Sequence, residues 1–179
     1  MKKNKIVITG GPGTGKSSVI HKLEEKGHDC LHEVSREVIR EAQLEGIEQL
    51  FLEDPLLFSR KLLEGRIKQF HEAEDFPSDH IFIDRGIPDV VAYMDFFNTS
   101  YAEDFILPCK DHRYEMIFIL PPWEAIYKSD NERYETFEEA TKISEYLENT
   151  YKHYGYDPIV VPEASVEERA NFILNKIGF

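Results

Sequence analysis

The stretch "VITGGPGTGKSSV", residues 7–19, places four glycines, one proline and one lysine within the seven positions from Gly10 to Lys16. A short apolar, β-branched run ends at Gly10, and helical periodicity begins at Lys16. Because a loop of this composition stabilises neither helix nor strand, we expect it to have another role. The spacing Gly10-xxxx-Gly15-Lys16-Ser17 is that of a phosphate-binding loop.

In such a loop, successive backbone N–H groups point at phosphate oxygens, and the following helix adds its positive end. Lys16 would reach the outer phosphates, and Ser17 would hold Mg²⁺. A glycine-rich turn without a ligand is the alternative, which the strand–loop–helix context disfavours. The sequence predicts nucleotide binding by nine consecutive residues: Gly10, Gly11, Pro12, Gly13, Thr14, Gly15, Lys16, Ser17 and Ser18.

The composition of the 179-residue chain indicates one soluble domain spanning residues 1–179. The formal net charge of −13 disfavours nucleic acid and anionic membranes as partners, because both need a basic face. No apolar run has transmembrane length, and the basic start is followed by too short an apolar run for a secretory signal. With only two cysteines, these features predict a cytoplasmic protein.

Short apolar runs alternate with helical patterns along the chain. We expect strands at 5–9, 29–33, 80–84, 115–120 and 158–161. We expect helices at 16–26, 35–46 and 54–74, near Pro88, after Thr136, and over a final stripe that begins at Val166. This alternation predicts an α/β fold, with a parallel sheet covered by helices on both faces.

Two further acidic positions follow predicted strands. Asp84 ends the run "IFID", where ligands of open α/β sheets bind, and would be a second Mg²⁺ ligand. Its neighbour Arg85 could bind an acceptor or neutralise the transferring phosphoryl group. Glu33 follows the second predicted strand and could orient or deprotonate a substrate hydroxyl, with Arg36 nearby. A helix-start carboxylate and a surface ion pair are the structural alternatives for these residues.

A polar stretch after the fourth predicted strand contains Lys128 and Arg133. We expect a lid over about 121–137, in which both cations close over the phosphates and Arg133 takes part in catalysis. A solvated loop with charge pairs is the alternative.

Other classes of phosphate-loop protein lack support in the sequence. A motor ATPase would need a glutamate beside Asp84, where Arg85 stands. A small GTPase would need DxxG and NKxD motifs, and the sequence contains neither motif. A transporter ATPase would need a signature insert before Asp84, and no such insert is seen. An arginine after a strand-end aspartate resembles the acidic–arginine pair of nucleoside and nucleotide kinases.

Four segments together carry a resemblance to a known family: "ITGGPGTGKSS", "HEVSREVI", "DRGIPDVVAY" and "RYEMIFILPPWEAIYKSDNERYETFEEA". They resemble small bacterial predicted ATPases of the AAA-type phosphate-loop class. That family is grouped with the nicotinamide riboside kinase domain of a bacterial NAD regulator and with a fly trafficking protein. The resemblance implies a nucleoside-kinase-like three-layer sandwich with strand order 2-3-1-4-5.

By position, the resemblance implies a nucleotide site at Gly10, Gly15, Lys16 and Ser17 and a catalytic pair of Asp84 and Arg85. It also implies an acceptor side at Glu33 and Arg36, with Arg85 adjoining, and a lid at Lys128 and Arg133. The family has no settled substrate to transfer.

We therefore expect a kinase that moves the γ-phosphate of ATP, or another nucleotide, with Mg²⁺ to a small hydroxyl or phosphate acceptor, a nucleoside-like one first. The alternative is a nucleotide-dependent switch acting through a protein partner; a binding-only sensor is weaker, because Lys16, Asp84 and Arg85 are all present. A kinase predicts a deep pocket between Glu33, Arg85 and the lid, and a switch predicts a flat surface. The acceptor, the preferred base and the oligomeric state stay open.

Overall fold

The computed structural model of the protein describes residues 3–127 and 135–179. Its centre is a five-stranded sheet in the order β2-β3-β1-β4-β5, with every neighbouring pair parallel. Both the order and the parallel pairing confirm the expectation. The strands are β1 (Asn4–Thr9), β2 (Asp29–Leu31), β3 (His80–Asp84), β4 (Met116–Ile119) and β5 (Ile159–Val160).

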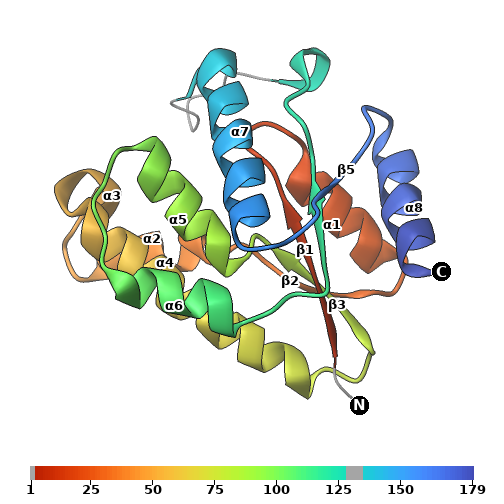
Figure 1. Ribbon diagram of the computed structural model, residues 1–179, viewed down its shortest axis with the longest axis horizontal. Coiled ribbons are helices and arrows are strands. Elements are labelled where there is room, and N and C mark those ends of the chain that lie inside the picture. Colours follow the sequence, from red (N-terminus) through yellow and green to blue (C-terminus); the bar gives the residue numbers. More distant parts are fainter. Residues whose placement is uncertain (1–2, 128–134) are drawn as a thin grey trace.

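Helices cover both faces of this sheet and give three layers (Figure 1). One face is covered by α1 (Lys16–Glu25) and α8 (Val166–Ile177). The other is covered by α4 (Pro55–Glu72), α5 (Ile87–Phe96), α6 (Glu103–Asp111) and α7 (Phe137–His153). The remaining helices are α2 (Ser35–Leu44), α3 (Leu50–Glu53) and the short 3₁₀ turns η1 (Ala73–Asp75) and η2 (Glu124–Ile126).

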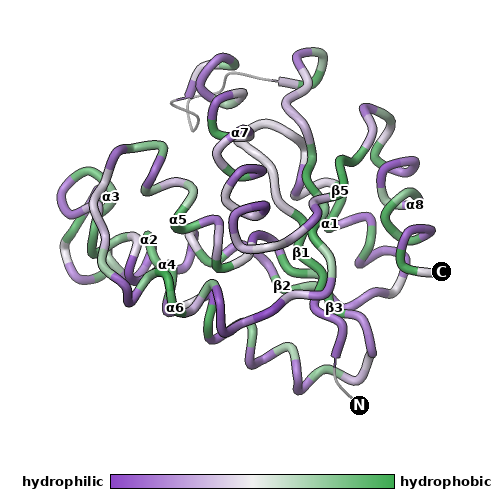
Figure 2. Tube along the Cα trace, viewed as in Figure 1, coloured by the Kyte–Doolittle hydropathy of each residue, from purple (hydrophilic) through white to green (hydrophobic). Residues whose placement is uncertain are grey.

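Alternate residues of the central strands supply the two halves of the core. Ile6 and Ile8 of β1 pack with α1 and α8, whereas Val7 packs with the opposite helices. Because both faces are buried, the strands read as continuous apolar runs. Figure 2 shows this hydrophobic colour along the strands in the middle of the sheet. Burial of apolar surface is the main force that holds the layers together.

Local signals in the sequence fix the starts of three helices. Asp54 caps α4 by accepting a hydrogen bond from the backbone of Leu57, 2.9 Å away, and Pro55 takes the first helical position. Thr136 and Ser165 begin α7 and α8, each in a capping box with the glutamate three residues later.

Several segments differ from the sequence-based prediction. The helix expected over 54–74 ends at Glu72 and continues as η1. Neither α3 nor α6 was predicted, because α3 has only four residues and α6 contains Pro108, which normally ends a helix. Strand β2 has three residues rather than five.

Among the described residues, no helix is long and apolar enough to cross a lipid bilayer.

The strand register brings the two predicted motifs together. Ile8 of β1 lies opposite Asp84 of β3, so the phosphate loop and the Asp84-Arg85 turn begin at the same edge of the sheet. The backbone N–H of Arg85 donates to the carbonyl of Ile8 at 3.0 Å and continues the pairing one residue past the strand. Carboxyl ends of parallel strands form the ligand edge of open α/β sheets.

Candidate active site

The loop between β1 and α1 has a backbone that only glycine adopts readily. Gly13 and Gly15 have φ angles of +73° and +82°, in the left-handed region. A Cβ at Gly10 would lie 2.6 Å from the carbonyl oxygen of Leu120, and one at Gly11 would lie 2.8 Å from that of Ala140. The glycines therefore let the loop pass close to Leu120, which follows β4, and to α7.

Side chains inside and behind the loop hold this shape. The Thr14 hydroxyl donates to the carbonyl of Gly11 at 3.0 Å. Arg169, a buried residue of α8, donates to the carbonyl of Thr14 at 2.9 Å. Lys16 Nζ lies 3.4 Å from the carbonyl oxygen of Gly11, curled over the loop. Burial, and after it the charge of Arg85, lowers the pKa of the Lys16 ammonium to about 8.

A large cavity opens beside the loop, with a volume of about 1470 Å³. Seven of the residues predicted from sequence line it: Lys16, Ser17, Ser18, Glu33, Arg36, Asp84 and Arg85. Its other walls come from α2, α3, α4, α5 and the start of α7, and they are largely apolar and aromatic. The phosphate loop and the predicted acceptor side therefore face one space.

Glu33 sits between two arginines at the polar end of this cavity. Its Oε1 lies 3.0 Å from Arg66 Nη2, and its Oε2 lies 2.6 Å from Arg85 Nε. The backbone N–H of Ser35 also donates to Oε1, at 3.2 Å. Burial alone would raise the pKa of the Glu33 carboxyl, but the charges of Arg66, Arg85 and Lys16 outweigh it and lower this pKa.

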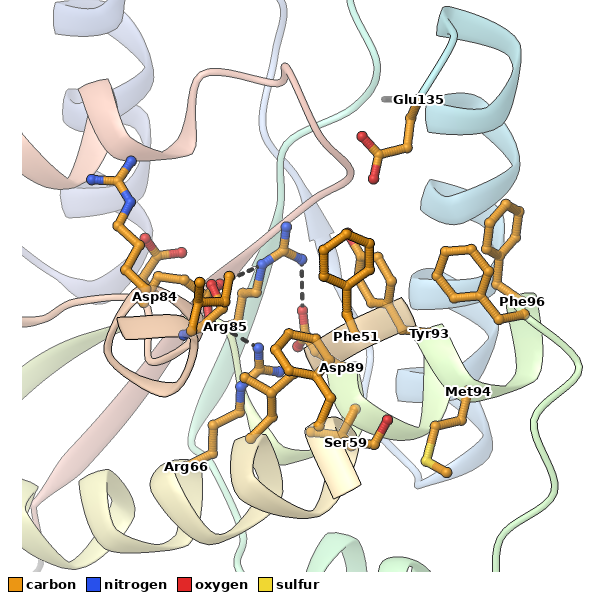
Figure 3. A pocket seen from close by; sticks show the side chains of 18 of the residues that line it. Phe51, Ser59, Arg66, Asp84, Arg85, Asp89, Tyr93, Met94, Phe96 and Glu135 are labelled. Carbon is orange, nitrogen blue, oxygen red and sulfur yellow. Dashed lines mark hydrogen bonds and ion pairs between the residues drawn. The ribbon is translucent and has the colours of Figure 1, made fainter. Parts of the chain in front are cut away.

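Arg85 is held at both its backbone and its guanidinium. Its φ of +68° is left-handed, which is uncommon for a residue other than glycine. Nη1 lies 3.2 Å from Asp89 Oδ1, and the guanidinium carbon lies 5.2 Å from the centre of the Tyr93 ring. Figure 3 shows the side chains of Arg66 and Arg85 directed toward the same part of the cavity.

The surroundings of Asp84 suit a carboxylate that binds a cation. It is buried, and its Oδ1 has no hydrogen-bond partner in the part of the chain that the structure describes. Burial raises the pKa of the Asp84 carboxyl, although the nearby Lys16 opposes this shift. Ser17, the other predicted metal ligand, lines the same cavity. Hydroxyl and carboxylate oxygens are ligands that Mg²⁺ accepts.

Two of the predicted residues cannot be placed, and one is peripheral. Lys128 and Arg133 lie outside the described residues. Arg36 is exposed on α2 and lines the cavity, and it makes no ion pair among residues 3–127 and 135–179.

Arg66 and Asp89 were not predicted from the sequence, although both are buried in contact with the predicted site. Asp89 lies in the quoted segment "DRGIPDVVAY", five residues after Asp84, and that spacing was the available signal. Arg66 stands out only as a charged residue at a buried position of a helix.

Comparison with known families identifies the fold family. Residues 5–169 match the family model described as an AAA domain. The chain belongs to this AAA-domain family. The match spans most of the chain and confirms the resemblance drawn from the four sequence segments. No curated protein matches the chain significantly.

Solved structures with the same fold include a deoxyadenosine kinase, a thymidylate kinase and the NadR protein. Deoxyadenosine kinase from M. mycoides with bound dATP superposes with a TM-score of 0.71 at 20% identity, covering 98% of this chain and 100% of that one. The NadR protein in complex with NR has a TM-score of 0.72 at 17% identity, covering 97% of this chain and 51% of that one. Thymidylate kinase from Candida albicans gives 0.68 at 16% identity, covering 98% and 91%. These likenesses show a nucleoside-kinase-like phosphate-loop fold.

Proposed function

We propose that this protein is a phosphate-loop kinase that transfers the γ-phosphate of ATP to a hydroxyl of a small, nucleoside-like acceptor. The observation that carries the proposal is the cavity of about 1470 Å³ that joins Lys16 and Ser17 to Glu33 and Arg85. A nucleotide switch needs no such space beside its phosphates, whereas a kinase needs room there for a second substrate. The kinases among the structural neighbours agree with this proposal.

The phosphate end of the site would bind the donor nucleotide. The loop N–H groups and the positive end of α1 would hold the phosphates, and Lys16 would neutralise charge on the transferring group. Ser17 and Asp84 would hold Mg²⁺, whose charge draws electron density from the phosphate oxygens. The buried, unpartnered Oδ1 of Asp84 supports this assignment.

The acceptor end would place a hydroxyl against Glu33. The acceptor oxygen forms a bond to the γ-phosphorus as the bond to the bridging oxygen of ADP breaks, and the hydroxyl proton leaves through the Glu33 carboxylate. Because the transition state of phosphoryl transfer is loose, orientation matters more than base strength. A carboxylate with a lowered pKa, held by two arginines, is suited to orienting the hydroxyl.

The charges around Glu33 favour a hydroxyl over a phosphate as the acceptor group. Arg66 and Arg85 are already paired with Glu33 and Asp89, so neither guanidinium is uncompensated. Arg36, the remaining arginine that lines the cavity among the described residues, is exposed on α2. A second phosphate would therefore meet little net positive charge there.

The far walls of the cavity suit a flat ring. Phe51 and Phe58 approach from α3 and α4 with their ring centres 6.2 Å apart, and Tyr93 lines the cavity from α5. Aromatic side chains bind planar groups by stacking.

Lys128 and Arg133 remain proposed lid residues, whose replacement should reduce acceptor-stimulated turnover more than ADP affinity.

The test is a transfer screen with Mg²⁺–ATP in which each nucleoside is paired with its own 5′-monophosphate, and products are identified by mass. We expect a nucleoside-like compound to gain one phosphate while its monophosphate partner does not. Transfer to monophosphates alone would support the assignment as a kinase and contradict the proposal that the acceptor group is a hydroxyl. Hydrolysis stimulated only by a protein partner would favour the switch.

A further inference from the structure

Four alternating charges form a closed ring at the polar end of the cavity. Glu33 pairs with Arg66 and Arg85, and Arg85 pairs with Asp89. The backbone of Gly86 closes the ring, because its carbonyl accepts from Arg66 at 2.9 Å and its N–H donates to Asp89 at 3.0 Å. Figure 3 shows Arg66, Arg85 and Asp89 converging at this point.

Asp89 is fully buried, and both of its oxygens are engaged. Oδ1 accepts from the Thr9 hydroxyl and from Arg85, and Oδ2 accepts from the Gly86 N–H and the Tyr151 hydroxyl. With four donors around it, this carboxylate has no oxygen left for a ligand. It connects the residue before the phosphate loop, the arginine after β3, and α7.

Arg66 occupies the corresponding place beside Glu33. It is 4% exposed, and its two terminal nitrogens donate to Glu33 and to Gly86. Long side chains such as Arg85 and Glu33 lose considerable rotamer freedom when they are fixed. Asp89 and Arg66, the two outer charges, therefore determine the direction of the Arg85 and Glu33 side chains before any substrate binds.

We propose that Asp89 and Arg66 are positioning residues, with Asp89 holding Arg85 and Arg66 holding Glu33 in the geometry for phosphoryl transfer. This inference rests on the proposed function, because it gives Arg85 and Glu33 their roles. Misplacement of a reacting group by about 1 Å can cost about 10²-fold in rate. Loss of either outer charge should therefore reduce turnover far more than nucleotide affinity.

The first test observes Arg85 directly in the full chain. Arg85 Nε lies 2.6 Å from Glu33 Oε2 in a largely buried ion pair, so its proton should give a shifted signal in nuclear magnetic resonance, assigned by its loss in Arg85→Lys. We expect Asp89→Asn to broaden or shift this signal. Tyr151→Phe, which removes a hydrogen bond to the same carboxylate but keeps the ion pair, should leave it in place. An unchanged signal in Asp89→Asn would overturn the proposal.

The second test measures ADP formation from Mg²⁺–ATP by the protein alone, together with ADP affinity. Asp89→Asn should slow turnover by about 10²-fold with ADP affinity within about twofold. In an Arg85→Met background the same change should add less than about twofold, because Asp89 acts through Arg85. Asp95→Asn, at an exposed site on α5, is the matched control.

Arg66→Lys provides a second route if Asp89→Asn does not fold. It keeps the charge but loses the two-pronged contact, and it should slow turnover with little further effect in a Glu33→Gln background. Additive losses in both double variants would show a purely structural role and contradict the proposal. A displaced Arg85 signal with unchanged turnover would instead contradict the role of Arg85 in the proposed function.

Discussion

Lys16 carries a positive charge at a position where burial and the charge of Arg85 both disfavour it. Its ammonium is partly buried and lies near the charge of Arg85, so its pKa is lowered to about 8. Phosphate oxygens favour the charged form and reverse this effect. A bound phosphate would therefore stabilise the charged form of Lys16.

Lys16→Ala should weaken Mg²⁺–ATP binding and lower turnover by about 10²-fold or more, because a charge-stabilising donor to the transition state is lost. The fold should persist, since Lys16 packs against the loop rather than in the core. Calorimetric titration with Mg²⁺–ATP measures the affinity. Lys22→Ala on the same helix, which loses its surface ion pairs with Glu25 and Glu167, is the control. Equal affinity in both variants would reject the assignment.

Asp84→Asn should reduce Mg²⁺-dependent turnover strongly and leave metal-free nucleotide binding nearly intact, because the carboxylate acts through the metal. Nucleotide titrations with Mg²⁺ and with a chelator separate the two effects. Asp79→Asn, at an exposed position before β3, should change neither. If binding falls equally with and without Mg²⁺, Asp84 has only a structural role.

Glu33 should make stability depend on pH in a defined direction. Its folded pKa is lowered below the ordinary value of 4.5, so its contribution is complete above that value and is lost as pH falls through the folded pKa. Glu33→Gln should therefore destabilise the protein more at about pH 7 than at about pH 4. Urea unfolding of both proteins at each pH measures the difference, with exposed Glu37→Gln as control. A pH-independent difference would contradict the ion pairs.

At the scale of elements, the sequence predicted what local patterns encode. The five strands read as apolar runs, and α7 and α8 read as apolar stripes, because burial leaves marks within a few residues. The strand order came from family resemblance, since long-range pairing leaves no local mark. The same reason explains the site: Glu33 and Arg85 were found beside strand ends, but Arg66 joins them only through the packing of α4.

That packing depends on a glycine. Gly65 lies in α4 where a Cβ would approach Val34 Cγ1 to 2.3 Å, and Val34 follows Glu33 directly. Ala usually stabilises a helix relative to Gly. At this contact, however, Gly65→Ala should destabilise the protein by about 1–3 kcal/mol through overpacking. Denaturant unfolding of Gly65→Ala beside Glu64→Ala, an exposed neighbour, measures this; a stabilised Gly65→Ala would contradict the close approach.

The whole molecule carries a formal net charge of −13 and yet presents a site suited to an anionic nucleotide. Loop N–H groups, the positive end of α1 and Lys16 make that site locally favourable for phosphate. The adjoining Arg66 and Arg85 are paired with Glu33 and Asp89, so these two guanidinium groups add little net positive charge beside the donor end. Under the proposed function, this charge distribution would favour a phosphate-bearing donor at one end of the site and an acceptor with a hydroxyl at the other.

The central claim is that the cavity beside the phosphate loop holds an acceptor. It is tested most directly by measuring ADP formed and phosphorylated acceptor formed in the same reaction. We predict slow ADP formation from Mg²⁺–ATP alone, a large rise with a nucleoside-like acceptor, and one phosphorylated acceptor for each additional ADP. ADP accompanied only by inorganic phosphate, at a rate that no small acceptor changes, would contradict the claim.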